Sequence, residues 1–392
     1  MSPVPVMDAG GLAGATAILL TVWRLSSRRR REVRFAPREF NIAVFGFVGA
    51  GKTMLLASLY NRLKVPGAAN VRLATTDEDD ARLVDYYRRA ANANAPTDWP
   101  DSNDKGSTTR WPFTIQVRPR FGVIIDAIRL NYLDYSGDSL KDAVEGNLDP
   151  GAVEVLSAIM KADVLMGVLD GGAVKRYLEG DPQLKFQEQM GVMLTRLSGH
   201  GKPVHLILTK WDIIEPYYKF PIVVERLMQL DHFADFAASQ TALKSPCRLI
   251  PVSAVGVGFV RYEEGKMVRQ PEQQINPFHV QMPLACALTP PDHILLRADG
   301  MIATPWRRAL RFVAGLPLRI TLRVPGVAVE IEGLNPAPRP GQPTSRSPTQ
   351  AELADAMNAV SDFFANLNRE LDDNPDYAAC RLDKYRPLRA QA

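Results

Sequence analysis

The chain has 392 residues, which is enough for one large domain with appendages or for two domains. Hydrophobic residues make up 46% and charged residues 23%, a balance that is typical of globular proteins and excludes a chain disordered throughout. The net charge of +4 is too small to indicate a nucleic-acid partner. The 3 cysteines are odd in number and far apart, so they indicate neither a disulfide framework nor a metal cluster and agree with a reducing compartment.

An apolar segment near the N-terminus is followed directly by arginines. Gly10 to Trp23 carries no charge, and the residues after it, up to Arg34, are rich in arginine. As a helix this segment would be roughly 21 Å long, against a hydrocarbon core of roughly 30 Å, and extending it back to Val4 would include Asp8. We expect residues 1–36 to anchor the chain in the inner (plasma) membrane, by one span or by embedding, with the arginines on the cytoplasmic face. A disordered or partner-bound tail is the alternative.

A phosphate-binding loop follows the first predicted strand, Glu39 to Phe45. Its sequence, GFVGAGKT, matches G-x-x-x-x-G-K-[ST] and leads into a helical run. Glycines let the backbone turn its N–H groups toward phosphate oxygens, and the start of the helix adds its positive dipole end. Lys52 would supply a charge to the β- and γ-phosphates, and the Thr53 hydroxyl would ligate Mg²⁺. The residues expected at the phosphates are Gly46, Gly49, Ala50, Gly51, Lys52, Thr53 and Met54.

A long polar stretch, residues 66–109, separates this loop from the next strand. It contains a helical pattern over residues 76–93 and a loop over residues 94–106. A GTPase has its first switch at this point of the chain, with a threonine that contacts Mg²⁺ and the γ-phosphate when GTP is bound. Thr108 and Thr109 precede the predicted strand Trp111 to Val117, and we take Thr108 as the Mg²⁺ ligand. An ordinary surface threonine is the alternative.

A D-x-x-G motif lies at the end of the following predicted strand, Ile124 to Leu133. It begins at Asp134 and ends at Gly137. Asp134 would hold Mg²⁺ through a water molecule, and the Gly137 N–H would contact the γ-phosphate. The motif is weak alone, but its place after a phosphate loop strengthens the interpretation.

Two later motifs indicate a guanine base. Thr209, Lys210 and Asp212 belong to a T-K-x-D motif that ends the predicted strand over residues 203–209. The Asp212 carboxylate can accept from guanine N1–H and the 2-amine together, whereas adenine would leave it unpaired. The Lys210 stem can lie along the base. Ser253 and Ala254 follow a strand over residues 248–252, and the Ala254 N–H can donate to guanine O6.

The predicted strands alternate with helical segments, and each motif lies at the carboxyl end of a strand. This order predicts an α/β fold with a mainly parallel sheet, helices on both faces and the ligand at the carboxyl edge. The hairpin of residues 111–117 with 124–133 adds one antiparallel edge strand. Residues 163–169 form another buried strand, 151–161 and 184–197 form helices, and 276–287 form a closing helix that Pro283 makes less regular. The nucleotide domain is expected over residues 37–289.

This ordered motif set resembles that of the Ras-like, translation-factor-related (TRAFAC) P-loop GTPases, over about residues 40–288. The resemblance implies bound GTP or GDP with Mg²⁺, hydrolysis of GTP by a molecular switch, and a protein effector at the switch regions. The N-terminal anchor is similar to that of the signal-recognition-particle receptor β subunit, and the long switch stretch resembles bacterial conflict-system GTPases. The family usually has glutamine after D-x-x-G, to orient the attacking water, but this chain has Asp138. Lys52, Gly137 and Asp138 are therefore the catalytic candidates, and a nucleotide-loaded recruitment module with little hydrolysis is the alternative.

The C-terminal part has three segments. Residues 290–332 form a small extension with a basic amphipathic helix at 305–314 and an alternating strand at 318–323, which face either a membrane or solvent. Residues 333–348 form a Pro-rich linker. Residues 349–392 begin with a helix whose apolar residues repeat by 4-3-4-3-4, either docked on the chain's own body or paired with a partner or a second copy over residues 349–371. Its apolar residues are Leu353, Met357, Val360, Phe364, Leu367 and Leu371.

Overall fold

The computed structural model describes residues 37–67, 69–93, 99, 108–118, 124–136, 150–263, 266–270, 272–288, 322–324, 327–329 and 350–385. The predicted N-terminal anchor, Gly137, Asp138, the helix at 305–314 and the Pro-rich linker lie outside these residues. Within the described part, no helix is both long and apolar enough to cross a bilayer. The predicted segment boundaries at residues 36, 289, 332 and 348 stay predictions.

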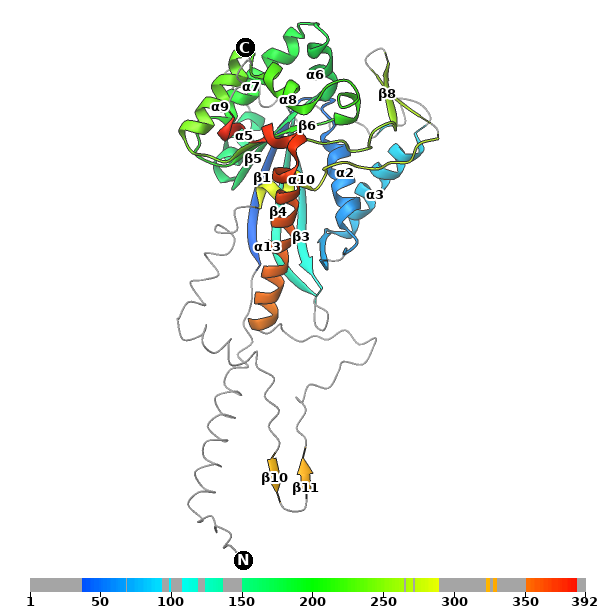
Figure 1. The fold of residues 1–392 in the computed structure, drawn as a ribbon, viewed down its shortest axis with the longest axis vertical. Helices are drawn as coiled ribbons and strands as arrows, with labels where there is room; N and C mark the ends of the chain where they lie inside the picture. The colour runs from blue at the N-terminus through cyan, green and yellow to red at the C-terminus, as the bar shows by residue number, and fades with distance from the viewer. Residues whose placement is uncertain are drawn as a thin grey trace, which may run out of the picture.

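In the described part of the chain, a sheet of 7 strands forms the centre of the fold, in the order β2-β3-β4-β1-β5-β6-β7. Strands β4, β1, β5, β6 and β7 are parallel, and β3 is antiparallel to β4. Every residue of β5 and β6 is buried, as expected for apolar strands covered by helices on both faces. The predicted α/β fold with a mainly parallel sheet is confirmed (Figure 1). The strands are β1 (Arg38–Gly46), β2 (Val71–Ala74), β3 (Thr108–Val117), β4 (Ile125–Ser136), β5 (Val164–Leu169), β6 (Val204–Leu208) and β7 (Cys247–Pro251).

The antiparallel edge of the sheet has two strands, β2 and β3, whereas the sequence predicted one antiparallel edge strand. Strand β2 pairs antiparallel with β3 and forms the edge of the sheet, so β3 is the second strand from it. β2 has only 4 residues, and its inward side chains, Val71 and Leu73, are buried. Two apolar positions within a polar stretch are too few to indicate a strand by alternation.

Helices connect the strands. Their bounds are α2 (Lys52–Leu63), α3 (Asp77–Asn92), α5 (Pro150–Lys161), α6 (Gly171–Leu178), α7 (Leu184–Leu197), α8 (Phe220–Leu227), α9 (Asp231–Ala242), α10 (Met282–Ala287) and α13 (Gln350–Asp373). Shorter elements are the turns η2 (Trp211–Ile213), η3 (Pro375–Cys380) and η4 (Leu382–Lys384), and the hairpins β8 (Val260–Glu263) with β9 (Lys266–Arg269) and β10 (Leu322–Val324) with β11 (Val327–Val329).

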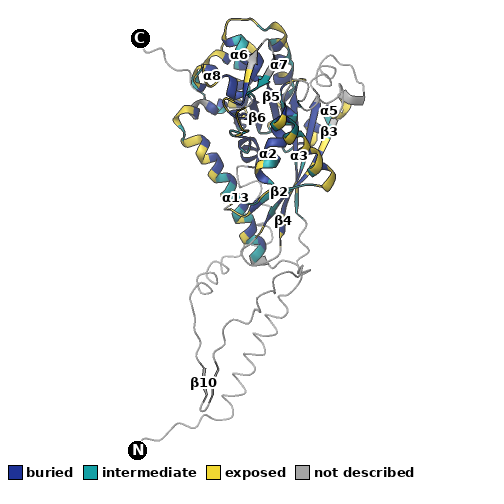
Figure 2. Cartoon of the chain, turned by 90° about the vertical axis from the view of Figure 1, so that its right-hand side faces the viewer, coloured by how far each residue is buried: buried dark blue, intermediate teal, exposed yellow. Residues whose placement is uncertain are grey.

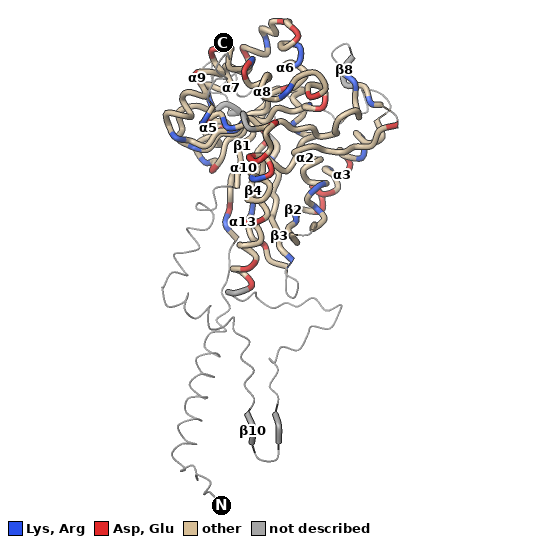
Figure 3. The backbone as a smooth tube through the Cα atoms, in the orientation of Figure 1, with Lys and Arg blue, Asp and Glu red and all other residues tan. Residues whose placement is uncertain are grey.

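Local sequence explains why α3 begins and ends where it does. The Thr76 hydroxyl caps α3 by accepting from the Asp79 N–H at 3.2 Å. The first turn of α3 is acidic and its last turn carries Arg89, which suits the helix dipole (Figure 3).

The predicted closing helix is much shorter than residues 276–287. Only α10 is helical, and Pro283 lies in its first turn, where the missing N–H costs no hydrogen bond. Residues 276–278 are not helical, because Asn276 donates to the Val255 carbonyl at 2.9 Å and Phe278 pairs with Ser253, and residues 279–281 form a turn. The proline therefore marks the start of the helix.

The C-terminal helix α13 docks on the chain's own body. It contacts α10 and strands β4, β3 and β2, and it lies alongside the lower part of the sheet in Figure 1. Val360 and Phe364 are 2% exposed and Leu371 is 0% exposed, whereas Met357 is half-buried. Figure 2 shows exposed residues on the outer side of α13 and buried residues along the strands. Of the two arrangements left open by the sequence, the described residues show the docking of this helix on its own chain.

Candidate functional site

The phosphate loop leaves the carboxyl end of β1 and enters α2. Gly49 and Gly51 have φ values of +82° and +81°, a left-handed backbone that glycine adopts without strain. A Cβ at Gly46 would lie 2.8 Å from the Val168 Cβ, so this position also requires glycine. Because α2 begins directly at Lys52, the positive end of its dipole lies at the loop, as an anion-binding site requires.

A buried cation and a buried carboxylate lie under this loop. Lys52 Nζ donates to the Gly46 carbonyl and lies 3.9 Å from Asp134 Oδ1. Lys52 is 9% exposed and Asp134 is 2% exposed. The register of the sheet brings them together, because Asp134 lies opposite Val44 where β4 pairs with β1. The loop and the start of the D-x-x-G motif thus form one site.

The donors near this carboxylate fit Mg²⁺. Thr53 is half-buried in the first turn of α2, beside Met54, and Asp134 supplies carboxylate oxygens. Thr109 lies opposite Asp134 in the pairing of β3 with β4, and Thr108 lies opposite Tyr135. Mg²⁺ prefers such oxygen ligands and usually completes its shell with phosphates and water. Among the described residues, no group of 3 or more His, Cys, Asp or Glu side chains could hold a metal ion.

Thr209 links the phosphate loop to the T-K-x-D motif. Its buried hydroxyl lies 2.7 Å from the Ala50 carbonyl and 2.9 Å from the Leu169 carbonyl. The fit is tight, because a Cβ on Gly171 would lie 2.0 Å from the Thr209 carbonyl oxygen. The sequence motif therefore fixes the spacing between the loop and the carboxyl ends of β5 and β6.

Lys210 is oriented by a residue that the sequence analysis missed. The Lys210 backbone is left-handed, with φ of +52°, and its Nζ pairs with Asp170 Oδ1 at 2.7 Å. Asp170 directly follows β5 and caps α6 by accepting from the Gly172 N–H at 3.0 Å. The sequence does contain a signal for this residue, because Asp170 stands between a predicted strand and two glycines, a typical position for a helix cap. The ion pair sets the direction of the lysine stem.

Asp212 is the most unusual acid of the site. Its side chain is 4% exposed, and Oδ1 accepts from the Ser253 hydroxyl at 2.6 Å. No other described residue donates a hydrogen bond to Oδ2. Burial raises the pKa of this carboxyl to about 6, against the opposing effect of the Ser253 hydrogen bond. A buried oxygen of this kind fits a ligand that brings its own N–H donors, as the edge of guanine does.

The loop after β7 closes the site from the other side. Ser253 Oγ accepts from the Gly256 N–H at 2.7 Å while donating to Asp212. The Ala254 carbonyl accepts from the Ser58 hydroxyl of α2 at 2.7 Å. Side-chain hydrogen bonds thus join the phosphate loop to the T-K-x-D motif, that motif to Ser253, and α2 to Ala254. Gly137 and Asp138 lie outside the described residues.

The described residues form an α/β fold with a mostly parallel sheet of 7 strands and a glycine-rich loop between β1 and α2. Solved structures similar to this chain include the signal recognition particle receptor SRb-GTP/SRX complex from Chaetomium thermophilum, with 13% identity and a TM-score of 0.34 over 57% of this chain and 94% of that chain. Era from Aquifex aeolicus bound to GDP.AlF4− has 14% identity and a TM-score of 0.28 over 55% of this chain and 52% of that chain. Sup35 complexed with GDP has 15% identity and a TM-score of 0.27 over 56% of this chain and 38% of that chain.

The strand order and the loop geometry described above define an α/β fold with a mainly parallel sheet. No protein-family model matches the chain, and no curated protein sequence matches it.

The raised pKa of Asp212 predicts a pH dependence of stability without any ligand. Its folded pKa of about 6 exceeds the ordinary value of 3.8, so the native state binds a proton more tightly than the unfolded chain. The stabilisation of the folded state by protonated Asp212 is fully present below about pH 4 and is lost as the pH rises through 6. Relative to Asp212→Asn, the wild type should gain about 1 kcal/mol of unfolding free energy between pH 6 and 5. Urea unfolding at several pH values measures this difference, and a difference that stays constant with pH would contradict the raised pKa.

Proposed function

We propose that this chain binds GTP and GDP with Mg²⁺ and hydrolyses GTP, as a molecular switch. The observation that supports this most strongly is the buried Asp212 carboxylate, whose Oδ2 receives no hydrogen bond from another described residue. It is joined to the phosphate loop through the T-K-x-D motif, because Thr209 contacts the Ala50 carbonyl. A base-recognising acid and a phosphate loop therefore lie at one edge of one sheet.

The base proposal follows from hydrogen-bond donors. Guanine presents N1–H and the 2-amine side by side, so the two Asp212 oxygens can accept from both. Adenine has an acceptor and no amine at these positions, and its complex would leave a buried carboxylate unpaired. The Lys210 stem, held by Asp170, would lie along the base, and the Ala254 N–H would donate to guanine O6.

The phosphate proposal uses the same geometry. Lys52 would exchange its contact with the Gly46 carbonyl for the β- and γ-phosphates, and loop N–H groups would bind the remaining oxygens. Thr53, Asp134 and Thr108 are the proposed Mg²⁺ ligands, Asp134 through a water molecule. When bound, Mg²⁺ neutralises charge on the phosphate oxygens.

The rate of hydrolysis depends on residues beyond the described part. Gly137 would contact the γ-phosphate, and Asp138 stands where a glutamine usually orients the attacking water. A carboxylate can accept a hydrogen bond from that water but repels the γ-phosphate, so slow intrinsic turnover is proposed. The same residue favours the second candidate function, a GTP-loaded module that recruits a partner through the switch regions with little hydrolysis.

Single-turnover hydrolysis separates these two functions. Purified full-length protein loaded with GTP should release phosphate slowly, and faster in the presence of cell extract if a partner completes the site. Lys52→Ala, which removes the charge at the γ-phosphate, should lower the rate by at least about a hundredfold in both settings. Phosphate release is the measurement, and no turnover by the wild type in either setting would leave only the recruitment module.

Exchanging the carboxylate for an amide should change the base preference. In Asp212→Asn one oxygen is replaced by an NH₂ donor, which suits the C2 carbonyl of xanthine and opposes the 2-amine of guanine. GDP affinity should fall by about a hundredfold and XDP affinity should rise. Competition against labelled nucleotide measures both, with Asp235→Asn on the exposed side of α9 as the matched control. An unchanged preference for GDP in Asp212→Asn would refute the base proposal.

We also propose that residues 1–36 tether the chain to the cytoplasmic face of the inner membrane. The support is the uncharged apolar segment followed by arginines. These residues join β1 at Arg38, at the end of the strand opposite the phosphate loop, so a tether there would leave the nucleotide edge accessible to an effector.

Deletion of residues 1–36 tests the tether. The truncated chain keeps every described residue, so it should fold and stay in the supernatant, whereas the full chain should sediment with vesicles that contain anionic lipid. Co-sedimentation is the measurement, and nucleotide binding by both forms is the control for folding. A truncated chain that still sediments would place the membrane contact elsewhere, such as around Trp306.

A further inference from the structure

The base-recognising acid depends on the spacing between two limbs of the chain. The first limb is η2, which carries Asp212, and the second begins with Ser253 after β7. They meet at the 2.6 Å hydrogen bond between Ser253 and Asp212 and at the 3.1 Å bond from the Trp211 N–H to the Val252 carbonyl. The side chains that pack behind these two limbs therefore also determine the position of the Asp212 carboxylate.

The first limb is supported by stacked aromatic rings. Trp211, which precedes Asp212, is 1% exposed and packs edge-on against Phe220, with ring centroids 5.6 Å apart at 79°. Phe220 begins α8 and in turn packs against Tyr377 of η3, with centroids 5.5 Å apart at 64°. The ring of Tyr377 therefore lies directly behind the ring that supports Trp211.

The second limb reaches the same tyrosine. Phe278 exchanges two backbone hydrogen bonds with Ser253, of 3.0 and 2.8 Å. The Phe278 ring stacks on His279 at 3.7 Å, and Tyr377 lies 5.9 Å from the Phe278 ring and 5.0 Å from the His279 ring. Burial lowers the pKa of His279 to about 4, so this ring is neutral near pH 7 and packs as an aromatic group.

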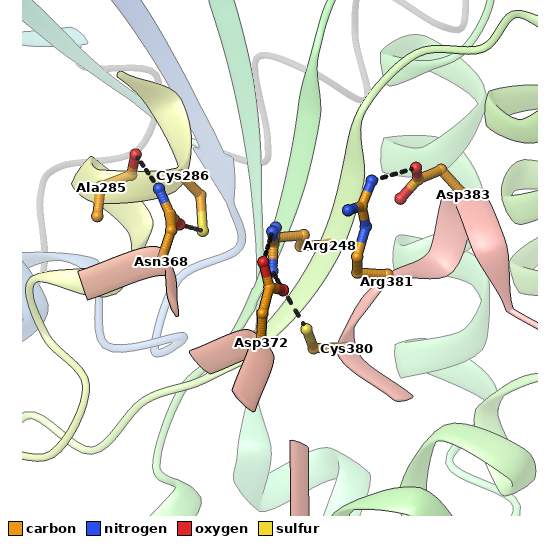
Figure 4. A network of polar contacts seen from close by, with 8 residues as sticks. All are labelled: Arg248, Ala285, Cys286, Asn368, Asp372, Cys380, Arg381 and Asp383. Atoms are coloured by element: carbon orange, nitrogen blue, oxygen red, sulfur yellow. Dashed lines mark hydrogen bonds and ion pairs between the residues drawn. The ribbon is translucent and has the colours of Figure 1, made fainter. Parts of the chain in front are cut away.

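Polar contacts fix the C-terminal segment that carries Tyr377, and Figure 4 shows those made by Asn368 and Asp372. Asp372 accepts two hydrogen bonds from the Arg248 guanidinium of β7, one of them at 2.9 Å. Asn368 donates to the Ala285 carbonyl of α10 at 3.0 Å. Asn374 caps η3 by accepting from the Asp376 N–H at 2.9 Å. The segment is thus fixed to β7 and α10, the two elements that flank the second limb.

We propose that Tyr377 is a positioning residue for base recognition, which acts from the C-terminal segment through the rings of Phe220 and Phe278. This inference rests on the proposed guanine binding. Its ring fills the space between Phe220 and Phe278 and is 6% exposed, so its removal would leave both limbs without support on one side. Displacements of about 1 Å are enough to misalign hydrogen-bonded groups, and here they would affect the two base contacts of Asp212. The phosphate loop lies between β1 and α2. Helix α2 contacts the second limb through the hydrogen bond from Ser58 to the Ala254 carbonyl, not through these aromatic rings.

Base discrimination is the readout that a merely structural role would not change. IDP has the phosphates and N1–H of GDP but lacks the 2-amine, so the ratio of the two affinities reports the second hydrogen bond of Asp212. In the full chain with Mg²⁺, the wild type should prefer GDP by about tenfold or more. Tyr377→Ala should reduce this preference by about tenfold, and Tyr377→Phe should retain it because the ring remains.

A matched control separates positioning from loss of stability. Val360→Ala shortens a side chain that is 2% exposed in the part of α13 before Asn368 and Asp372, and should lower stability without changing the ratio of GDP to IDP affinity. Unfolding of each variant is followed alongside binding. If Tyr377→Ala does not fold, Tyr377→Leu replaces the ring with a smaller apolar side chain and should lower the ratio in the same direction.

The possible failures are distinguishable. A wild type that binds GDP and IDP equally would contradict the proposed guanine site itself. A wild type that prefers GDP, with the preference unchanged in Tyr377→Ala or Tyr377→Leu, would overturn only the role of Tyr377. An equal loss of preference in Val360→Ala would show that any damage to the C-terminal segment has the same effect, and would overturn the role of Tyr377 as well.

Discussion

The hydroxyl group of Thr209 connects the phosphate loop with the carboxyl ends of β5 and β6. The side chain of Thr209 lies within hydrogen-bond distance of two carbonyls, those of Ala50 in the phosphate loop and Leu169 at the end of β5. The Leu169 carbonyl also accepts from the Thr209 backbone N–H at 3.1 Å, so the single proton of the hydroxyl is available for the Ala50 carbonyl. This buried hydrogen bond fixes the distance between the loop and the sheet within narrow limits.

The parallel sheet explains why motifs far apart in the chain meet. Strands β1, β4, β5, β6 and β7 end at the same edge, and each carries one piece of the site at or shortly after its carboxyl end. Full burial of β5 and β6 on both faces holds these ends at constant spacing. The side chains that follow neighbouring strands are therefore close enough to contact one another directly, as in the pairs Lys210–Asp170 and Ser253–Asp212.

The parts of this architecture that sequence could predict are those with a local signature. The phosphate loop follows from its glycines and lysine, α7 from its apolar periodicity, and α13 from the repeat that ends at Leu371. Strand β2 was missed because its four residues carry too little pattern. The aromatic cluster was missed for another reason, since Tyr377 and Phe278 are distant in sequence and meet only through tertiary packing. Pro283 was misread because the same residue breaks a helix in its middle and begins one at its start.

The distance in sequence between the phosphate loop and Tyr377 has a consequence for how the protein is made. Translation produces the phosphate loop long before it produces η3. Domains fold as they emerge, so the sheet and its loop can form while the ring behind Trp211 and Phe278 is still missing. The aromatic cluster is completed only after Tyr377 has been made, and a product that stops before this residue has the loop without that support.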